Sequence, residues 1–332
     1  MRSSAKVTGT GMYVPDRVVT NDDLARLMDT SDEWIRQRSG IVERRYIEPG
    51  QQPADLAVQA SRRALEAAGR EPGEIECIVL ATLSAQADFP GTAFFLQEQL
   101  GAGEIPCFDL RAQCSGFVYS LGVANALVRS GQFRRMLVVG CEVHSTVIDL
   151  SDAGRDVAVL FGDGAGAALV EPCAPGEEGV IDFHNDIDGS GGCNLYMPGG
   201  GSLNPPSHET VDKKMHYVHQ DGRQVFKYAV RRMCEVPEML LSRNGFKSSD
   251  LDLLVPHQAN ERIIRATQER LGLSDERVLL NISKYGNTTA GTIPLALVDA
   301  LNCGRLKKGN LVMLLAVGAG YTTGGMLLRW AY

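Results

Sequence analysis

Two stretches of this sequence repeat each other in order, and the duplication restricts the fold more than any other feature. Residues 64–80 align without a gap with residues 240–256: each copy has a helix-like run, a glycine suited to end it, a polar turn and a buried strand. The Leu-Gly pairs that end segments 97–101 and 268–272 also match, as do residues 130–140 and 303–315. Three matches in one order predict two copies of one α/β unit.

Continuous apolar strands alternate with helix-like segments in both copies. Such strands are expected at residues 77–82, 136–140 and 311–317. Strands without polar alternation are typical of sheets covered by helices on both faces, which predicts a pseudo-symmetric layered α/β fold. The predicted halves are residues 1–172 and 222–332. Residues 173–221 between them are rich in Gly, Pro, Asp and Asn, and are expected to form an insertion with little regular structure except at its edges.

Cys114 lies where a strand-like segment ends and a small-residue helix, residues 116–128, begins. Free N–H groups and the positive end of the helix dipole favour a thiolate there, so Cys114 is a candidate nucleophile. The second copy supplies His257 directly after its strand and Asn287 before its own small-residue helix. Because Ala81 and His257 occupy equivalent places, and Cys114 and Asn287 each follow a Leu-Gly pair, we expect a Cys/His/Asn site where the halves meet.

The net charge of -7 and the pI near 5.5 argue against an extended nucleic-acid surface. A local basic patch for an acidic protein partner remains compatible with this charge, although a solvated helix face is the simpler interpretation of each member. The candidates are Lys227, Arg231, Arg232, Arg262 and Arg265. No apolar run reaches the roughly 18 residues of a membrane span, so we expect a cytoplasmic protein that does not contact membranes.

The eight cysteines are scattered and form no Cys-x-x-Cys pair. Neither a disulfide framework nor a structural zinc site is expected. His216 and His219 have a spacing compatible with metal binding but lack a third ligand, so no metal site is predicted.

Five segments, taken in order, give the chain a resemblance to the β-ketoacyl-acyl-carrier-protein synthase III family of the thiolase superfamily. They are residues 30–41, the Cys114 segment, and residues 160–167, 256–260 and 285–288. The resemblance implies a thiolase-like αβαβα fold with two pseudo-twofold halves, a homodimer, and no cofactor. It also implies a two-step reaction: an acyl-CoA primer acylates Cys114, and decarboxylation of malonyl-acyl carrier protein then yields 3-oxoacyl-carrier protein, CO2 and CoA.

The resemblance further assigns roles to individual residues. His257 and Asn287 would donate hydrogen bonds to the enolate that forms on decarboxylation, and the backbone N–H groups of Cys114 and Ala319 would form an oxyanion hole. CoA and its pantetheine arm would contact Trp34, Arg38, Arg155, Gly222, Phe226 and Asn260. Lys227 and Arg262 would dock the carrier protein. Phe89, from across the dimer, would line the acyl pocket with Gln113, Phe161 and Val317. Without the resemblance, Trp34 also suits a core anchor, Asn260 a helix cap and Phe226 ordinary packing.

Several positions depart from the family's commonest pattern: Gln113 before the nucleophile, Arg223, Val317 and residues 321–323. They favour, as an alternative, a specialised polyketide-pathway enzyme that joins acyl chains or passes an acyl group to another nucleophile. A Cys/His/Asn thioester hydrolase is the alternative from another class, although the papain-like signature is absent. A hydroxymethylglutaryl-CoA synthase is disfavoured, because residues 81–89 contain no glutamate.

Overall fold

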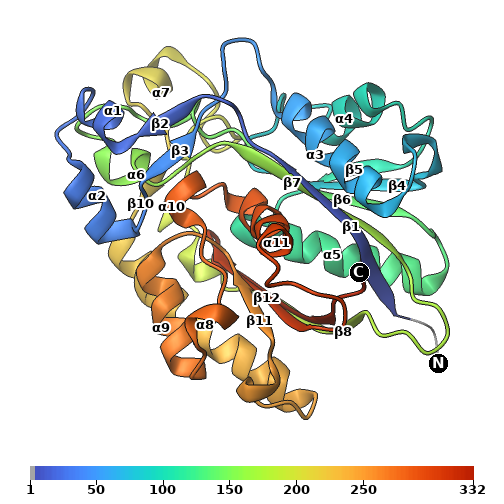
Figure 1. Cartoon of the computed structure of the whole chain (residues 1–332). Helices are drawn as coiled ribbons and strands as arrows, with labels where there is room; N and C mark the ends of the chain where they lie inside the picture. Colours follow the sequence, from blue (N-terminus) through green and yellow to red (C-terminus); the bar gives the residue numbers. More distant parts are fainter. Residues whose placement is uncertain (1–3) are drawn as a thin grey trace.

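The computed structural model describes residues 4–332, which form two mixed β-sheets separated and covered by helices (Figure 1). The strands of the first sheet, in spatial order, are β1 (Ala5–Tyr13), β7 (Gly164–Pro172), β6 (Met136–Glu142), β4 (Cys77–Ala81) and β5 (Cys107–Leu110). Those of the second are β11 (Leu253–Pro256), β12 (Leu311–Gly318), β13 (Thr322–Arg329) and β8 (Val180–Ile187). The three apolar strands expected from the sequence are present, with ends shifted by no more than two residues.

Three layers of helices complete a five-layer αβαβα arrangement. Helices α5 (Gly116–Ser130) and α11 (Thr292–Asn302) lie between the sheets, as Figure 1 shows. Helices α3 (Pro53–Ala68) and α4 (Thr92–Leu100) cover the outer face of the first sheet, and α8 (Gly222–Arg243) and α9 (Glu261–Leu271) cover that of the second. The predicted layered fold is therefore confirmed.

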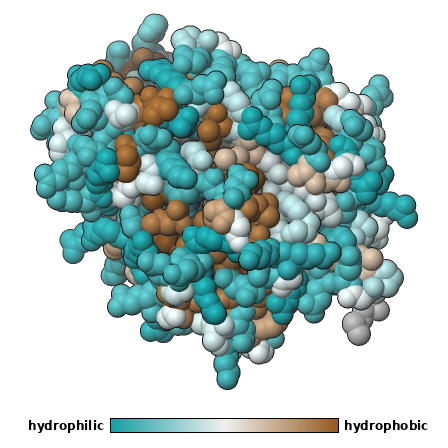
Figure 2. Space-filling view, in the orientation of Figure 1, coloured by the Kyte–Doolittle hydropathy of each residue, from teal (hydrophilic) through white to brown (hydrophobic). Residues whose placement is uncertain are grey.

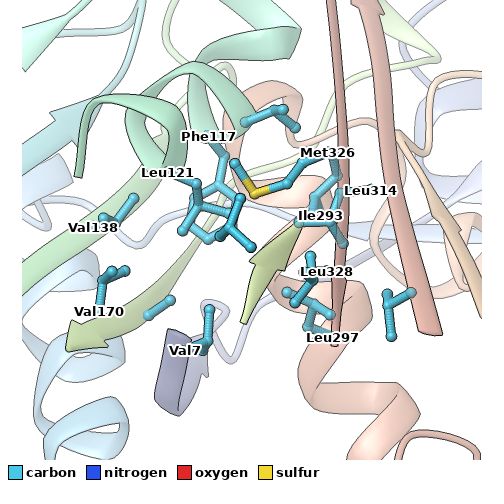
Figure 3. Close-up of a cluster of buried hydrophobic side chains, with 14 of the residues drawn as sticks. Val7, Phe117, Leu121, Val138, Val170, Ile293, Leu297, Leu314, Met326 and Leu328 are labelled. Atoms are coloured by element: carbon cyan, nitrogen blue, oxygen red, sulfur yellow. The ribbon is translucent and has the colours of Figure 1, made fainter. Parts of the chain in front are cut away.

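The central core lies where both sheets pack against the middle helices. Figure 3 shows apolar side chains from α5, α11 and the strands of both sheets converging there, among them Val7, Phe117, Leu121, Val138, Val170, Ile293, Leu297, Leu314, Met326 and Leu328. All of these are at most 5% exposed. Because this core belongs to both halves, the two copies fold as one body.

Shorter elements gather at one end of the molecule, toward the upper left of Figure 1. They are β2 (Val18–Thr20), α1 (Asn21–Ala25), α2 (Asp32–Ser39), β3 (Glu43–Arg45), α6 (Arg155–Ala158), β9 (Leu195–Tyr196), α7 (His208–Asp212), β10 (His219–Gln220) and α10 (Ile282–Tyr285). Short 3₁₀ helices occur at Pro72–Glu74, Gln113–Ser115, Gly189–Gly191, Ser248–Asp250, Asp275–Arg277 and Thr289–Gly291.

The prediction that residues 173–221 form an insertion between the halves is wrong for the N-terminal part of this segment. Strand β8 lies inside it and pairs antiparallel with β13, as β1 pairs antiparallel with β7 in the first sheet. The second copy therefore begins near residue 180 rather than at 222. The excursion between its first strand and first helix spans residues 188–221.

The duplication also has a different register at the site than the sequence suggested. Gln113 and Thr289 both have a left-handed backbone, with φ of 47° and 41°, and each starts the 3₁₀ helix that leads into a central helix. Cys114 therefore corresponds to Ala290, and Asn287 lies three residues earlier.

The surface carries hydrophilic residues over most of the face in Figure 2, with apolar residues gathered in separate areas. No helix within residues 4–332 is both long enough and apolar enough to cross a bilayer.

Candidate active site

Cys114, His257 and Asn287 line one cavity of about 490 Å³ at the junction of the halves. Each comes from a different segment: the start of α5, the end of β11 and the loop before α11. Of the other predicted site residues, the same cavity is lined by Trp34, Arg38, Phe161, Gly222, Phe226, Asn260, Arg262 and Val317. Phe89, Gln113, Arg155, Lys227 and Ala319 are not among the lining residues.

The Cys114 thiol is buried, and this overturns the expectation of a thiolate. Burial, and to a smaller extent the charge of Glu142, raise the pKa of Cys114 to about 12. Backbone N–H groups of Ala319 and of Cys114 itself act in the opposite direction. Because desolvation outweighs these donors, the resting nucleophile is a neutral thiol.

The turn between β12 and β13 approaches Cys114 very closely. A Cβ on Gly318 would lie 2.8 Å from both the backbone nitrogen and the Cβ of Cys114, so only glycine fits there. The next residue, Ala319, has a backbone N–H that favours the thiolate form of Cys114, as does the N–H of Cys114 itself.

His257 is 3% exposed and neutral, since burial lowers its pKa to about 3. Its backbone N–H donates to the Leu315 carbonyl at 2.7 Å, and Nδ1 lies 2.6 Å from the Thr292 hydroxyl. Nε2 is buried and has no hydrogen-bond partner in the described part of the chain. The imidazole therefore presents a neutral, unengaged nitrogen in a residue that lines the cavity.

Asn287 is anchored through its backbone and its side chain. Its N–H donates to Leu160 at 2.8 Å, and its carbonyl accepts from Gly162 at 3.1 Å. Its side-chain oxygen accepts from the backbone N–H of Thr289 at 2.8 Å. This last bond fixes which end of the amide is oxygen, so Nδ2 is the end that can donate to a ligand.

Two buried polar residues near the site were missed by the sequence analysis. Glu142, at the end of β6, accepts hydrogen bonds from the loop after β4, including one of 2.6 Å from the Ser84 hydroxyl. His144 is 1% exposed and neutral, since burial lowers its pKa to about 3. The only signal in the sequence was a charged residue two positions after the expected apolar strand 136–140.

The mouth of the cavity contains an aromatic ring between cations. The guanidinium of Arg38 lies 4.5 Å from the Trp34 ring centroid, and that of Arg155 lies 5.1 Å from it. Trp34 contacts the cluster under α1 and α2 but also lines the cavity, so the core and ligand roles are compatible. Asn260 is the N-cap of α9, as the alternative interpretation held, and its amide also donates to the Arg38 carbonyl at 2.8 Å.

The start of α8 and α9 form the opposite rim. Gly222 begins α8, and Phe226 lies one turn later on the same helix. The guanidinium of Arg262, from α9, packs 5.1 Å from the Phe226 ring centroid. Lys227 is exposed next to them.

The deep wall of the cavity includes Phe161, Val317 and Tyr321. The Tyr321 ring stacks on Tyr228 at 4.0 Å, and its hydroxyl accepts from Asn194 at 2.7 Å. Phe89 is 87% exposed on this chain.

The structure gathers no metal-binding cluster of three His, Cys, Asp or Glu side chains within residues 4–332. His216 packs on Tyr217, and His219 belongs to strand β10.

Comparison with known families gives two matches, which together cover more than half of the chain. Residues 108–189 match 3-oxoacyl-[acyl-carrier-protein] synthase III, and residues 241–330 match the C-terminal part of the same enzyme family.

Individual relatives agree with this along the whole chain. A β-ketoacyl-[acyl-carrier-protein] synthase III of Koribacter versatilis is 52% identical, with 99% of this chain and 98% of the relative aligned. The crystal structure of 3-oxoacyl-[acyl-carrier-protein] synthase III from Aquifex aeolicus superposes with a TM-score of 0.90 at 41% identity, covering 98% and 100% of the two chains. The priming β-ketosynthase of the R1128 polyketide pathway gives 0.91 at 35% identity, covering 99% and 97%.

Proposed function

This chain belongs to the β-ketoacyl-acyl-carrier-protein synthase III family of condensing acyltransferases, and on that premise we propose that Cys114 carries an acyl group between CoA and malonyl-acyl carrier protein. The observation that carries the proposal is the single cavity that Cys114, His257 and Asn287 share with Trp34 and Arg38 at its mouth.

In the first step, the thiol sulfur attacks the thioester carbon of an acyl-CoA. The S–H proton leaves to a base, the bond to the CoA sulfur breaks, and CoA departs as the thiol. Neutral His257 supplies a nitrogen lone pair for the proton, and the N–H groups of Cys114 and Ala319 stabilise the tetrahedral oxyanion.

In the second step, malonyl-acyl carrier protein loses CO2, and the resulting enolate carbon attacks the carbonyl carbon of the Cys114 thioester. The bond from this carbon to Cys114 Sγ breaks, 3-oxoacyl-acyl carrier protein leaves, and the Cys114 thiolate takes up a proton from solvent. Asn287 Nδ2 and the N–H form of His257 Nε2 donate to the enolate oxygen. The Thr292 hydroxyl lies 2.6 Å from Nδ1 and 2.9 Å from the Thr289 carbonyl, and when its hydrogen points to Nδ1 the imidazole hydrogen is on Nε2. Backbone and side-chain groups of the protein thus supply every donor in the two steps, so we propose that no metal or cofactor takes part.

Mass spectrometry tests this function. The protein, incubated with a series of acyl-CoAs, is expected to gain an acyl adduct on Cys114 that disappears when malonyl-acyl carrier protein is added, with one CO2 per turnover. Cys114→Ala should form no adduct. Loss of the adduct to water without malonyl consumption would instead identify a thioester hydrolase.

The same series identifies the primer. The 35% identical polyketide priming enzyme and the unusual Gln113 and Tyr321 favour a specialised primer as the second candidate. Fastest adduct formation with a short straight-chain acyl-CoA would favour a role in fatty-acid synthesis, whereas a branched or longer primer would favour the specialised pathway.

The carrier protein is proposed to bind at Lys227 and Arg262, beside the cavity. Charge reversal at either residue should raise the KM for malonyl-acyl carrier protein most strongly at low salt. Lys307→Glu, an exposed lysine before β12, is the matched control and should leave the KM unchanged.

A homodimer is proposed because β5 is an edge strand of the first sheet, with pairing only to β4. Such an edge needs a partner or a cover. The exposed Phe89 lies in the loop whose residues 84–86 line a second cavity of about 810 Å³. Light scattering should give twice the monomer mass of 35.9 kDa. A monomeric protein that is fully active would contradict the dimer and the role of Phe89.

Since all eight cysteines within residues 4–332 are free thiols, we also propose a reducing, cytoplasmic compartment.

A further inference from the structure

Thr289 adopts a backbone conformation that threonine rarely takes. Its φ of 41° is left-handed, and it is only 3% exposed. In this conformation its N–H reaches back two residues to the side-chain oxygen of Asn287 at 2.8 Å. The orientation of the Asn287 amide therefore depends on what holds Thr289.

A buried histidine holds the Thr289 hydroxyl. His144 Nε2 lies 3.0 Å from the hydroxyl oxygen, and both residues are at most 3% exposed. Because Nε2 and the hydroxyl can each donate or accept, this hydrogen bond forms with either tautomer of the imidazole.

His144 also supports the backbone of Asn287. Its ring packs on Phe161, with centroids 4.7 Å apart, and Phe161 forms a parallel bridge to Asn287. The next residue, Gly162, donates to the Asn287 carbonyl. The backbone of His144 is itself held by a 2.7 Å bond to the Asp163 carboxylate. Both the side chain and the backbone of Asn287 are thus connected to one buried histidine.

We propose that His144 is a positioning residue for decarboxylation: through the Thr289 hydroxyl and the Phe161 ring it holds the Asn287 amide with Nδ2 available to the malonyl thioester. His144 itself touches no substrate. The proposal rests on the function proposed above, and it separates the two half-reactions, because acylation of Cys114 does not use the Asn287 amide.

His144→Leu tests this, because leucine fills the space but cannot form a hydrogen bond with the Thr289 hydroxyl. The expected result is that CO2 release from malonyl-acyl carrier protein falls by roughly tenfold or more in kcat, as expected for a misaligned donor. The rate of adduct formation on Cys114 and the KM for acyl-CoA should stay at the wild-type values.

His144→Gln is the matched control, because the side-chain amide of glutamine can take the place of Nε2 as the hydrogen-bond partner of the Thr289 hydroxyl. It should restore most of the lost decarboxylation, and circular dichroism should show both variants folded. Wild-type decarboxylation in His144→Leu, an equal loss of both half-reactions, or no recovery in His144→Gln would each overturn the proposal. If the wild-type protein itself forms no adduct and releases no CO2, the proposed function fails instead.

Discussion

The surroundings of Cys114 have opposite effects on the pKa of its thiol. The helix start and the N–H groups of Cys114 and Ala319 favour negative charge, whereas burial and Glu142 disfavour it. The sequence showed only the first influence, because the helix start is local, whereas the burial comes in part from the segment at Gly318, which is distant in the sequence. A neutral thiol kept among oxyanion donors becomes charged only as it reacts, which protects it from adventitious oxidation.

Replacing Glu142 tests the opposing charge. Glu142→Gln keeps the shape but removes the carboxylate, so the pKa of Cys114 should fall. Alkylation of Cys114 by iodoacetamide at pH 8 should become roughly three- to tenfold faster, because one pKa unit changes the thiolate fraction tenfold. The rate is measured by mass spectrometry of the Cys114 peptide. An unchanged or slower rate in a folded variant would show that Glu142 does not act on the thiol.

His257 should affect the two half-reactions unequally. In His257→Ala, Cys114 is expected to be acylated more slowly but still completely, because the backbone donors remain and water can accept the proton. Decarboxylation should fall by roughly 10²–10³-fold, the usual effect of losing one enolate donor. Adduct formation and CO2 release are followed in separate assays. Equal losses in both would assign His257 mainly to the first step.

The three central residues were found from the sequence because each lies in a short segment after a strand or before a helix. Glu142 and His144 were not, because their contacts are long-range: Glu142 accepts from Ser84, 58 residues away, and His144 contacts Thr289, 145 residues away. No local pattern marks such a pair.

At the scale of elements, Asn260 couples two of them. Its side-chain oxygen caps α9, and its amide donates to the last turn of α2, which carries Arg38 at the cavity mouth. One residue therefore stabilises a helix and fixes the position of a segment that lines the cavity.

These two roles are separable by substitution. Asn260→Ala should lower the free energy of unfolding by about 1 kcal/mol, the usual cost of losing an N-cap, and raise the KM for acyl-CoA. Asn260→Asp keeps the capping oxygen, so it should recover the stability but not the KM, because it cannot donate to Arg38. Urea unfolding and acylation kinetics measure the two effects. Recovery of both by aspartate would leave the link to α2 without a role.

The duplicated elements were predictable where their sequences are strongly apolar. Strand β8 was missed because only one of its eight residues is buried. Its charged and polar residues are typical of a loop. It is an edge strand, which needs fewer apolar residues than a central one.

At the scale of the whole molecule, the two copies have the same topology but different chemistry. The first contributes Cys114, the proposed nucleophile, before α5, and the second contributes His257 and Asn287, the proposed donors. Where the two copies meet, their backbones come too close together to leave room for a side chain. A Cβ on Gly140 of β6, for example, would lie 2.2 Å from the carbonyl oxygen of Ala290. The sequence predicted the pairing of the halves, but the register, with Cys114 opposite Ala290, follows from backbone geometry that spacing alone does not determine.

The stability of the whole molecule should depend on pH through the two histidines buried at this junction. Burial lowers the pKa of both His144 and His257 from 6.5 to about 3. Below pH 6.5 the unfolded chain binds protons that the native state does not. The stabilisation is therefore complete above pH 6.5 and is lost as the pH falls from 6.5 toward 3, by at most about 1.4 kcal/mol per pH unit for each histidine.

The variant His144→Gln isolates one of these contributions. The buried carboxyls Glu142 and Asp163, whose pKa values burial raises, have the opposite effect on stability, but they are present in both proteins. Urea unfolding at pH 6 and pH 5 should show the wild type losing about 1 kcal/mol more than the variant over this interval. Equal losses would mean that His144 is protonated in the native state, and a charged imidazole is not compatible with this buried position beside Phe161. The dependence on pH thus tests the burial on which the position of Asn287 rests.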